Sequence, residues 1–453
     1  MSRSVRALYR ADWVLPVTAP PIRNGAVLVD DAGCIAAVGP QAAIEPPQGI
    51  EIIELGEAIL LPGLINAHAH AELAMFRGAL EDLPFCDWIV RLVGAKRGTL
   101  QDEDYRWAAR WTMVEALRVG ITTIACTESS TAAVAALREA GMRGIVYQEV
   151  FGPDPADAES AIRGLRERVE ALRRDESADD LVRVGISPHA PYTVSDRLYR
   201  LGAELAIGEG FPMALHIAES AAERALVANG GGDFQPGLNA RGIATPVRAG
   251  SPIELLDRLG VLRARPLLIH VVDVDDEDVR RIGASGSSVA HCPIANARLG
   301  HGIAPVTEMR AAGVPVALGT DSVGSNNRLD LLEEARVASI LQRARLRTPA
   351  ALGGEELLRM CTLEGARALG IEHRVGALQP GLEADLCAVS LRGVHARPVH
   401  DPLAALFHST RGCDVILTVV RGRVLYNGER VLTVDEEATR SALDGIARRM
   451  GER

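Results

Sequence analysis

The sequence lacks several features that would indicate a membrane, nucleic-acid-binding or disulfide-stabilised protein. No apolar run reaches the length needed to cross a bilayer. The net charge of −10 and the absence of a Lys/Arg block argue against non-specific nucleic-acid binding. The seven cysteines are scattered without a CxxC pair, which favours a reducing cytoplasm over a disulfide framework. We therefore expect a cytoplasmic protein with neither a membrane nor a nucleic-acid partner.

Signatures of nucleotide-binding folds are missing too. No GxGxxG follows the first predicted strand of the parallel sheet, and no GxxxxGK[ST] occurs anywhere, which leaves a doubly wound open sheet without support. The first residues alternate apolar and turn positions, which predicts short strands and no signal peptide. With 47% hydrophobic and 24% charged residues, the composition is that of an ordinary globular protein, and 453 residues suffice for two or three domains.

The middle of the chain alternates apolar runs with helical patterns, which predicts a parallel sheet. Eight segments are expected to be strands: 64–70, 121–127, 144–150, 182–189, 213–219, 267–271, 288–291 and 316–321. Eight strands with intervening helices predict an α/β fold, a (β/α)8 TIM barrel over residues 61–373. Residues 1–60 and 374–453 contain short β segments, and we expect both termini to form one small β-sandwich, followed by a C-terminal helix.

Histidines and carboxylates recur at the C-terminal ends of these predicted strands, where TIM barrels carry their active sites. His68 and His70 end the first strand, and residues two apart on a strand project to the same face. Two imidazoles on one face are half of a divalent-metal site. A single histidine at an apolar strand end is usually a core residue, but this pattern recurs along the chain. Later predicted strands end in His189, in His216 and Glu219, in His270, and in Asp321.

In their order and spacing, these motifs resemble the amidohydrolase superfamily, specifically its cytosine/adenosine-type deaminase and triazine-hydrolase branch. The resemblance rests on residues 62–70, 187–192, 216–219, 270 and 319–322. It implies that His68, His70, His216 and Asp321 bind one divalent metal ion, zinc with ferrous iron as the alternative. His189 stands where binuclear members carry a bridging lysine, so a single ion is expected.

The resemblance also implies a reaction. The enzyme would be a hydrolase of C–N bonds in cyclic amidines, adding metal-activated hydroxide to an aminated N-heterocycle and releasing ammonia. A zinc ion lowers the pKa of its bound water to about 7, which supplies hydroxide at neutral pH. Glu219, His270 and Asp321 are the expected catalytic residues, since each can move a proton between water and substrate. The small-molecule substrate would be purine-like or nucleoside-like, and barrels of this branch often form homodimers.

Substrate contacts are predicted from looser signals. In relatives that deaminate S-adenosylhomocysteine and methylthioadenosine, a ribose-binding glutamate falls near Arg97 and a carboxylate-binding arginine near Gln148. Neither residue type is present at the matching position. The spacing of Glu72 after His70, with residues 147–152, resembles instead a sub-branch that includes aminodeoxyfutalosine deaminases. The candidate substrate-binding residues are His189, Glu72, Trp88, Arg77 and Gln148.

Several alternatives stay open at this point. A triazine-type chlorohydrolase or amidohydrolase would use the same metal and would expel chloride or an alkylamine from a ring carbon. A guanine, pterin or cytosine deaminase would differ only in its substrate pocket. A non-catalytic barrel is disfavoured by the intact set of histidines and carboxylates. Trp88 has a second interpretation as a core residue, and Arg77 has one as a structural residue of its loop.

Overall fold

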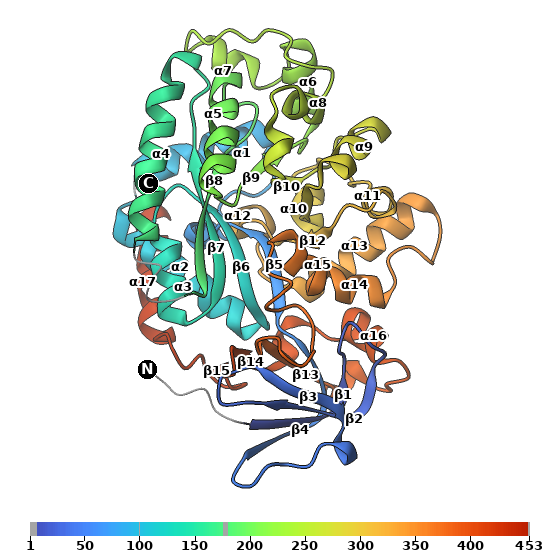
Figure 1. The fold of residues 1–453 in the computed structure, drawn as a ribbon. Coiled ribbons are helices and arrows are strands. Elements are labelled where there is room, and N and C mark those ends of the chain that lie inside the picture. Colours follow the sequence, from blue (N-terminus) through green and yellow to red (C-terminus); the bar gives the residue numbers. More distant parts are fainter. Residues whose placement is uncertain (1–6, 99, 175–179, 452–453) are drawn as a thin grey trace.

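The computed structural model describes residues 7–98, 100–174 and 180–451, so the outermost residues of both predicted terminal segments lie outside the described part. All eight predicted strands of the middle region are present, and the expected α/β class with parallel strands is confirmed (Figure 1). They form two four-stranded parallel sheets. One sheet contains, in order, β5 (Leu64–Ala69), β6 (Ile121–Glu128), β7 (Arg143–Val150) and β8 (Val182–Pro188). The other contains β12 (Val316–Leu318), β11 (Ser288–His291), β10 (Leu267–His270) and β9 (Ala214–Ile217).

The two sheets meet at both pairs of outer strands. Ala69 of β5 forms a parallel bridge with Asp321 just after β12, and Ile186 of β8 forms one with Met213 just before β9. The second seam also carries a 2.9 Å hydrogen bond from Ile186 N to Pro212 O. Every residue of β5, β6 and β7 is buried, as expected for parallel strands covered on both faces.

Helices connect the strands and lie on the outside of the sheets (Figure 1). The buried residues of α4, Ala158, Leu165 and Val169, recur at helical spacing, so one face of this helix packs on the core. A serine side chain caps α5, because Ser195 Oγ accepts a hydrogen bond from Leu198 N. The helices are α1 (Phe85–Gly98), α2 (Asp102–Arg118), α3 (Ala132–Ala140), α4 (Ala158–Arg173), α5 (Asp196–Glu209), α6 (Ala221–Asn229), α7 (Gln235–Asn239), α8 (Pro252–Arg258), α9 (Asp276–Ser285), α10 (Pro293–Arg298), α11 (Val306–Ala311), α12 (Val323–Asn326), α13 (Leu331–Leu346), α14 (Gly354–Cys361), α15 (Leu363–Ala368), α16 (Pro402–Ala404) and α17 (Glu436–Gly451).

Strands from the two ends of the chain share one further sheet, at the bottom of Figure 1. Its seven strands are, in order, β15 (Arg423–Tyr426), β14 (Val415–Val420), β13 (Leu386–Ser390), β4 (Glu51–Pro62), β1 (Ala7–Val14), β2 (Ile22–Val29) and β3 (Ile35–Pro40). The two ends meet where β4 pairs antiparallel with β13, with Pro62 opposite Leu386. Arg143 of β7 ties the parallel sheet to this one through a buried ion pair with Asp385, Nε to Oδ2 at 3.0 Å.

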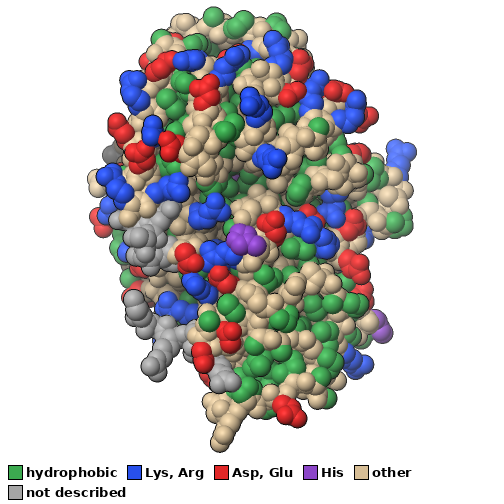
Figure 2. Space-filling view, in the orientation of Figure 1, with side chains coloured by type: hydrophobic (Ala, Val, Ile, Leu, Met, Phe, Trp, Pro, Cys, Tyr) green, Lys and Arg blue, Asp and Glu red, His purple; other side chains and the backbone are tan. Residues whose placement is uncertain are grey.

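Acidic and basic side chains are interspersed over the described part of the face in Figure 2. The predicted C-terminal helix is present as α17, which packs against α2. Within the described ranges, no helix has both the length and the apolar character that crossing a membrane requires.

Candidate active site

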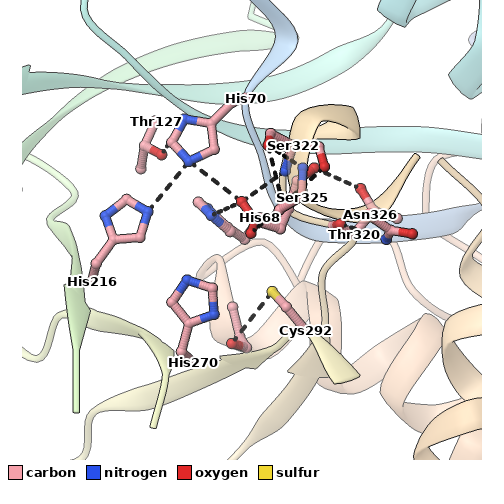
Figure 3. A network of polar contacts seen from close by, with 12 residues as sticks. His68, His70, Thr127, His216, His270, Cys292, Thr320, Ser322, Ser325 and Asn326 are labelled. Carbon is pink, nitrogen blue, oxygen red and sulfur yellow. Dashed lines mark hydrogen bonds and ion pairs between the residues drawn. The ribbon is translucent and has the colours of Figure 1, made fainter. Parts of the chain in front are cut away.

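Four histidines and one aspartate, contributed by the ends of four strands, meet at the carboxyl ends of the parallel strands, and Figure 3 labels the histidines. His68 Nε2 and His70 Nε2 lie 3.4 and 3.5 Å from Asp321 Oδ1. His70 Nε2 also lies 3.3 Å from His216 Nε2. The ring of His270 lies 5.7 Å from that of His68 and 5.5 Å from that of His216, between centroids. The structure thus brings together the side chains predicted to bind a metal.

The protonation states of this cluster suit a divalent cation. Burial lowers the pKa values of His68 and His216, and it lowers that of His70 to about 4, so their imidazoles are neutral at pH 7. Burial would raise the pKa of Asp321, but its contact with His68 outweighs this and keeps the carboxylate ionised. His68 Nε2 is buried and makes no hydrogen bond with any residue that the structure describes. Neutral imidazoles with free ring nitrogens and one carboxylate form a donor set for zinc.

Reciprocal hydrogen bonds join β5 to the segment after β12, and these two segments carry His68 and Asp321. Asn66 Nδ2 donates to Thr320 Oγ1 at 2.8 Å, and Thr320 N donates to Asn66 Oδ1 at 3.1 Å. The carbonyl oxygen of His68 accepts hydrogen bonds from the backbone N–H groups of Thr320 and Asp321, both at 3.0 Å. Asp321 has a left-handed φ of 58°, a strained conformation of the kind found at functional sites. Its Oδ2 accepts a 2.8 Å hydrogen bond from Ser325 Oγ, which fixes the carboxylate.

Glu219 lies next to this cluster with two histidines around its carboxylate. Its Oε1 is 3.5 Å from His270 Nε2 and 3.3 Å from His301 Nε2. Burial would raise the pKa of Glu219, but His270 lowers it below the ordinary value, so the carboxylate is ionised. The Asn296 amide oxygen, 2.9 Å from His270 Nδ1, can only accept, so Nδ1 is the donor and Nε2 faces Glu219. Glu223 accepts the backbone N–H of Glu219 at 3.0 Å and holds that segment in place.

A cavity of about 760 Å³ opens onto these groups. This volume lies within the usual range for small-molecule sites. One wall comes from α1, which contributes Trp88, Val93 and Lys96. The floor includes His216, Glu219, His270 and Asp321, so a ligand in the cavity reaches the whole cluster.

Two of the predicted substrate-binding residues line this cavity. Trp88 does so while its Nε1 donates to Gly324 O at 3.3 Å. His189 contributes a ring centred 4.8 Å from that of His216, and burial lowers its pKa to about 3. The Thr193 hydroxyl donates to Ala190 O and therefore accepts from His189 Nδ1 at 2.8 Å. His189 Nε2 is left with a lone pair that can accept a hydrogen bond from a ligand.

The structure does not bring the other three predicted substrate-binding residues to the described cavity wall. Gln148 is buried, and its amide donates to Ser130 O at 2.9 Å and accepts from Arg168 at 3.1 Å. The Glu72 carboxylate binds Lys96 Nζ at 2.6 Å and the Ser130 backbone N–H at 3.0 Å. Arg77 donates to Asn327 O at 3.0 Å and forms an ion pair with Glu115, beside a different pocket.

Four residues at the site were not among the sequence-based candidates: Lys96, Ser129, Glu149 and His301. Glu149 ends β7, so the strand-end criterion that identified His189 also applies to it. Ser129 directly follows the end of β6 and meets the same criterion. Lys96 and His301 lie on a helix and in a loop, and they reach the site only through the packing of those segments.

A model of the Amidohydrolase family matches residues 59–425. A 5-methylthioadenosine/S-adenosylhomocysteine deaminase of Moorella thermoacetica is 33% identical over 427 residues, covering 94% of this chain and 95% of that protein. A 5'-deoxyadenosine deaminase of Methanopyrus kandleri is 31% identical over 419 residues, covering 92% and 93% of the two chains.

The fold has a similar solved structure as well. The zinc-bound crystal structure of an adenosine deaminase from Xanthomonas campestris matches with a TM-score of 0.88 and 27% sequence identity. The match covers 99% of both chains, so the terminal sheet is shared along with the parallel strands.

Proposed function

The chain belongs to the amidohydrolase family, and from this premise we propose that it is a metal-dependent deaminase of adenosine-type nucleosides. It hydrolyses a C–N bond in a cyclic amidine and releases ammonia. One observation carries the proposal: the ionised Glu219 carboxylate lies beside the cluster of histidines and Asp321, on the floor of a cavity of about 760 Å³. The deaminases similar to this chain act, by their names, on 5'-modified adenosines.

We propose that His68, His70, His216 and Asp321 hold one divalent ion, which is zinc. The neutral imidazoles and the free, buried Nε2 of His68 support this assignment. Zinc suits three nitrogen donors and one carboxylate, and ferrous iron is the alternative. When bound, such an ion acts as a Lewis acid and lowers the pKa of a bound water to about 7.

The protein's own side chains then move protons and hold the substrate. Glu219 is ionised and lies beside the cluster, so it would take a proton from the attacking water and pass it to a ring nitrogen of the base. Protonation there makes the neighbouring amino-bearing carbon electrophilic. The hydrogen bond to Asn296 holds the His270 ring in place, and His270 Nε2 orients the carboxylate of Glu219. Asp321 would accept the second proton of the water and return it to the amino group, which then leaves as ammonia. The free Nε2 of His189 accepts a hydrogen bond from the substrate.

The test is the release of ammonia from 5'-methylthioadenosine, 5'-deoxyadenosine and adenosine by metal-loaded protein. Glu219→Gln should lower kcat by about 100- to 10,000-fold, the usual contribution of a general acid–base, without changing the metal content. Glu139→Gln makes the same change at an exposed ion pair with Arg110 and should behave like wild type. If all three nucleosides are inert, or if Glu219→Gln retains full turnover, the proposal fails.

We also propose that the eight parallel strands form one closed (β/α)8 barrel. The bridges at both seams, Ala69 with Asp321 and Ile186 with Met213, support closure. The proposed division is a barrel over residues 61–373 and a small β-sandwich from residues 1–60 and 374–453 with a C-terminal helix. The seven-stranded sheet shared by both ends of the chain supports the joining of the two terminal segments in one unit. The homodimer and the cytoplasmic location stay predictions.

A further inference from the structure

One buried carboxylate in the cavity has no part in the proposed reaction. Glu149 ends β7, is 7% exposed and lines the cavity wall. Its Oε2 is 3.3 Å from Ser129 Oγ. Its Oε1 makes no hydrogen bond within the described part of the chain and stands 3.9 Å from His189 Nε2. Because Glu149 lines the cavity and no described side chain donates to this oxygen, Oε1 is placed to accept a hydrogen bond from a ligand.

A small polar network holds Glu149 in place. Lys96 Nζ lies 2.6 Å from Glu72 Oε1 and 3.0 Å from Ser129 Oγ. Ser129 Oγ lies 3.1 Å from Glu72 Oε1 and 3.3 Å from Glu149 Oε2, so one hydroxyl joins the ion pair to the second carboxylate. Lys96 balances the charge of one carboxylate only. Burial raises the pKa of Glu149 to about 7, so this carboxyl group is partly ionised at neutral pH. In its ionised form the network carries a net negative charge, which favours hydrogen-bond donors and disfavours an anionic ligand.

We propose that Glu149 binds the 2'- and 3'-hydroxyls of the substrate sugar and that the chain therefore requires a ribonucleoside; this inference rests on the proposed deaminase function. A carboxylate offers two acceptor oxygens, and a vicinal diol offers two donors at matching separation. Ser129 is a positioning residue, because it orients the carboxylate without itself being needed for the contact.

The position of Glu149 in the cavity fits a sugar. It lies beside His189, whose ring is 4.8 Å from that of His216, so a diol bound there is next to the reacting base. Phe151 also lines the cavity, with its ring centred 5.0 Å from that of His189. It is 45% exposed, and with Val93 it forms an apolar rim. A nucleoside with its sugar at Glu149 would direct an apolar 5' substituent toward this rim.

The experiment compares three substrates that differ only in the sugar: 5'-deoxyadenosine, 2',5'-dideoxyadenosine and 3',5'-dideoxyadenosine. In wild type, loss of either hydroxyl should lower kcat/KM by about 10- to 100-fold, the range for a hydrogen bond to a charged group. In Glu149→Ala, the kcat/KM values for the three substrates should differ by no more than about threefold, because the acceptor of the hydroxyl groups is gone. Ser129→Ala should weaken the preference as well, with most of the change in KM and less of it in kcat, because the carboxylate stays in place but is less well oriented.

Glu139→Gln, at an exposed ion pair, is the control and should keep the wild-type preference. Metal content is measured in parallel, because Glu149, His189 and His216 also have ligand atoms within 4.8 Å of one another. If wild type and Glu149→Ala each contain one ion, the result supports sugar binding by Glu149. If wild type contains a second ion that Glu149→Ala lacks, Glu149 is a metal ligand and the inference is overturned. If wild type deaminates nucleosides and Glu149→Ala keeps the full preference for 5'-deoxyadenosine over the dideoxy substrates, this inference fails and the proposed function stands. Failure of wild type to deaminate any nucleoside overturns the proposed function as well.

Discussion

Gly319 lies between β12 and Asp321 and packs against His68, and we expect its replacement by alanine to disrupt the proposed metal site. A Cβ at this position would stand 2.9 Å from the His68 Cβ, 3.0 Å from the His68 N and 3.0 Å from the Cys292 Sγ. These contacts are at least about half an ångström shorter than the optimum between carbon atoms. All three neighbours are rigid or buried, so the strain cannot be relieved by the far end of a flexible side chain.

The expected cost follows from this geometry. Overpacking a rigid core typically costs about 1–3 kcal/mol of folding stability. His68 must move by roughly the overlap, and functional constellations tolerate only about 0.5 Å of displacement. We therefore expect Gly319→Ala to lower metal affinity by about 10- to 100-fold, as disturbance of groups supporting metal ligands does. Turnover should fall in proportion to the metal lost.

The assay is metal content after dialysis against a competing chelator, together with the free energy of unfolding in urea. Gly164→Ala on α4 is the matched control, since an added Cβ there meets nothing within 4 Å. Alanine favours the helix by about 0.5–1 kcal/mol over glycine, so this control should be slightly stabilised with full metal content. A folded Gly319→Ala protein that binds metal as tightly as wild type would refute the reasoning.

Two further variants test the supports of the site and of the fold. Glu223 accepts the backbone N–H groups of Ala218 and Glu219 at 2.7 and 3.0 Å, and Glu223→Gln replaces one acceptor by a donor. We expect the free energy of unfolding in urea to fall by about 1–3 kcal/mol and kcat to fall about tenfold. An unchanged kcat would contradict the role of Glu223 in holding the segment that carries Glu219. Arg143→Ala leaves Asp385 buried without its cation and should cost about 3–5 kcal/mol with metal content retained. In comparison, Arg166→Ala at an exposed pair should leave the free energy of unfolding close to that of wild type.

The strands were predictable because each is a short apolar run bounded by helical patterns or turns. The metal-binding candidates were predictable for a related reason, since His68, His70, His216 and Asp321 are polar residues at the ends of otherwise buried strands. The catalytic candidate His270 meets the same criterion. Parallel strands present their carboxyl ends at one edge, so sequence positions far apart were expected to meet. The geometry of the cluster agrees with that expectation.

The substrate contacts were harder to predict, and Gln148 and Glu149 show why. Neighbouring residues on a strand point to opposite faces, so only one of the two can face the cavity. All eight residues of β7 are buried, so the sequence has no polar–apolar alternation that fixes which one it is. Resemblance directed attention to Gln148, whose amide is instead bound to Ser130 and Arg168. Lys96 reaches the cavity from α1, whose packing angle no local pattern specifies.

The proposed chemistry and the proposed specificity rest on parts of the fold with different constraints. The carbonyl of His68 accepts two backbone hydrogen bonds from the segment that carries Asp321, so the metal-binding side chains are attached to a hydrogen-bonded ladder and cannot shift independently. Glu149, by contrast, is oriented through Ser129 and Lys96, one of which comes from a helix inserted between two strands. Substitutions in α1 can therefore change which sugar is accepted without moving the ladder. Substrate range should vary with this helix, while the reaction at the strand ends stays the same.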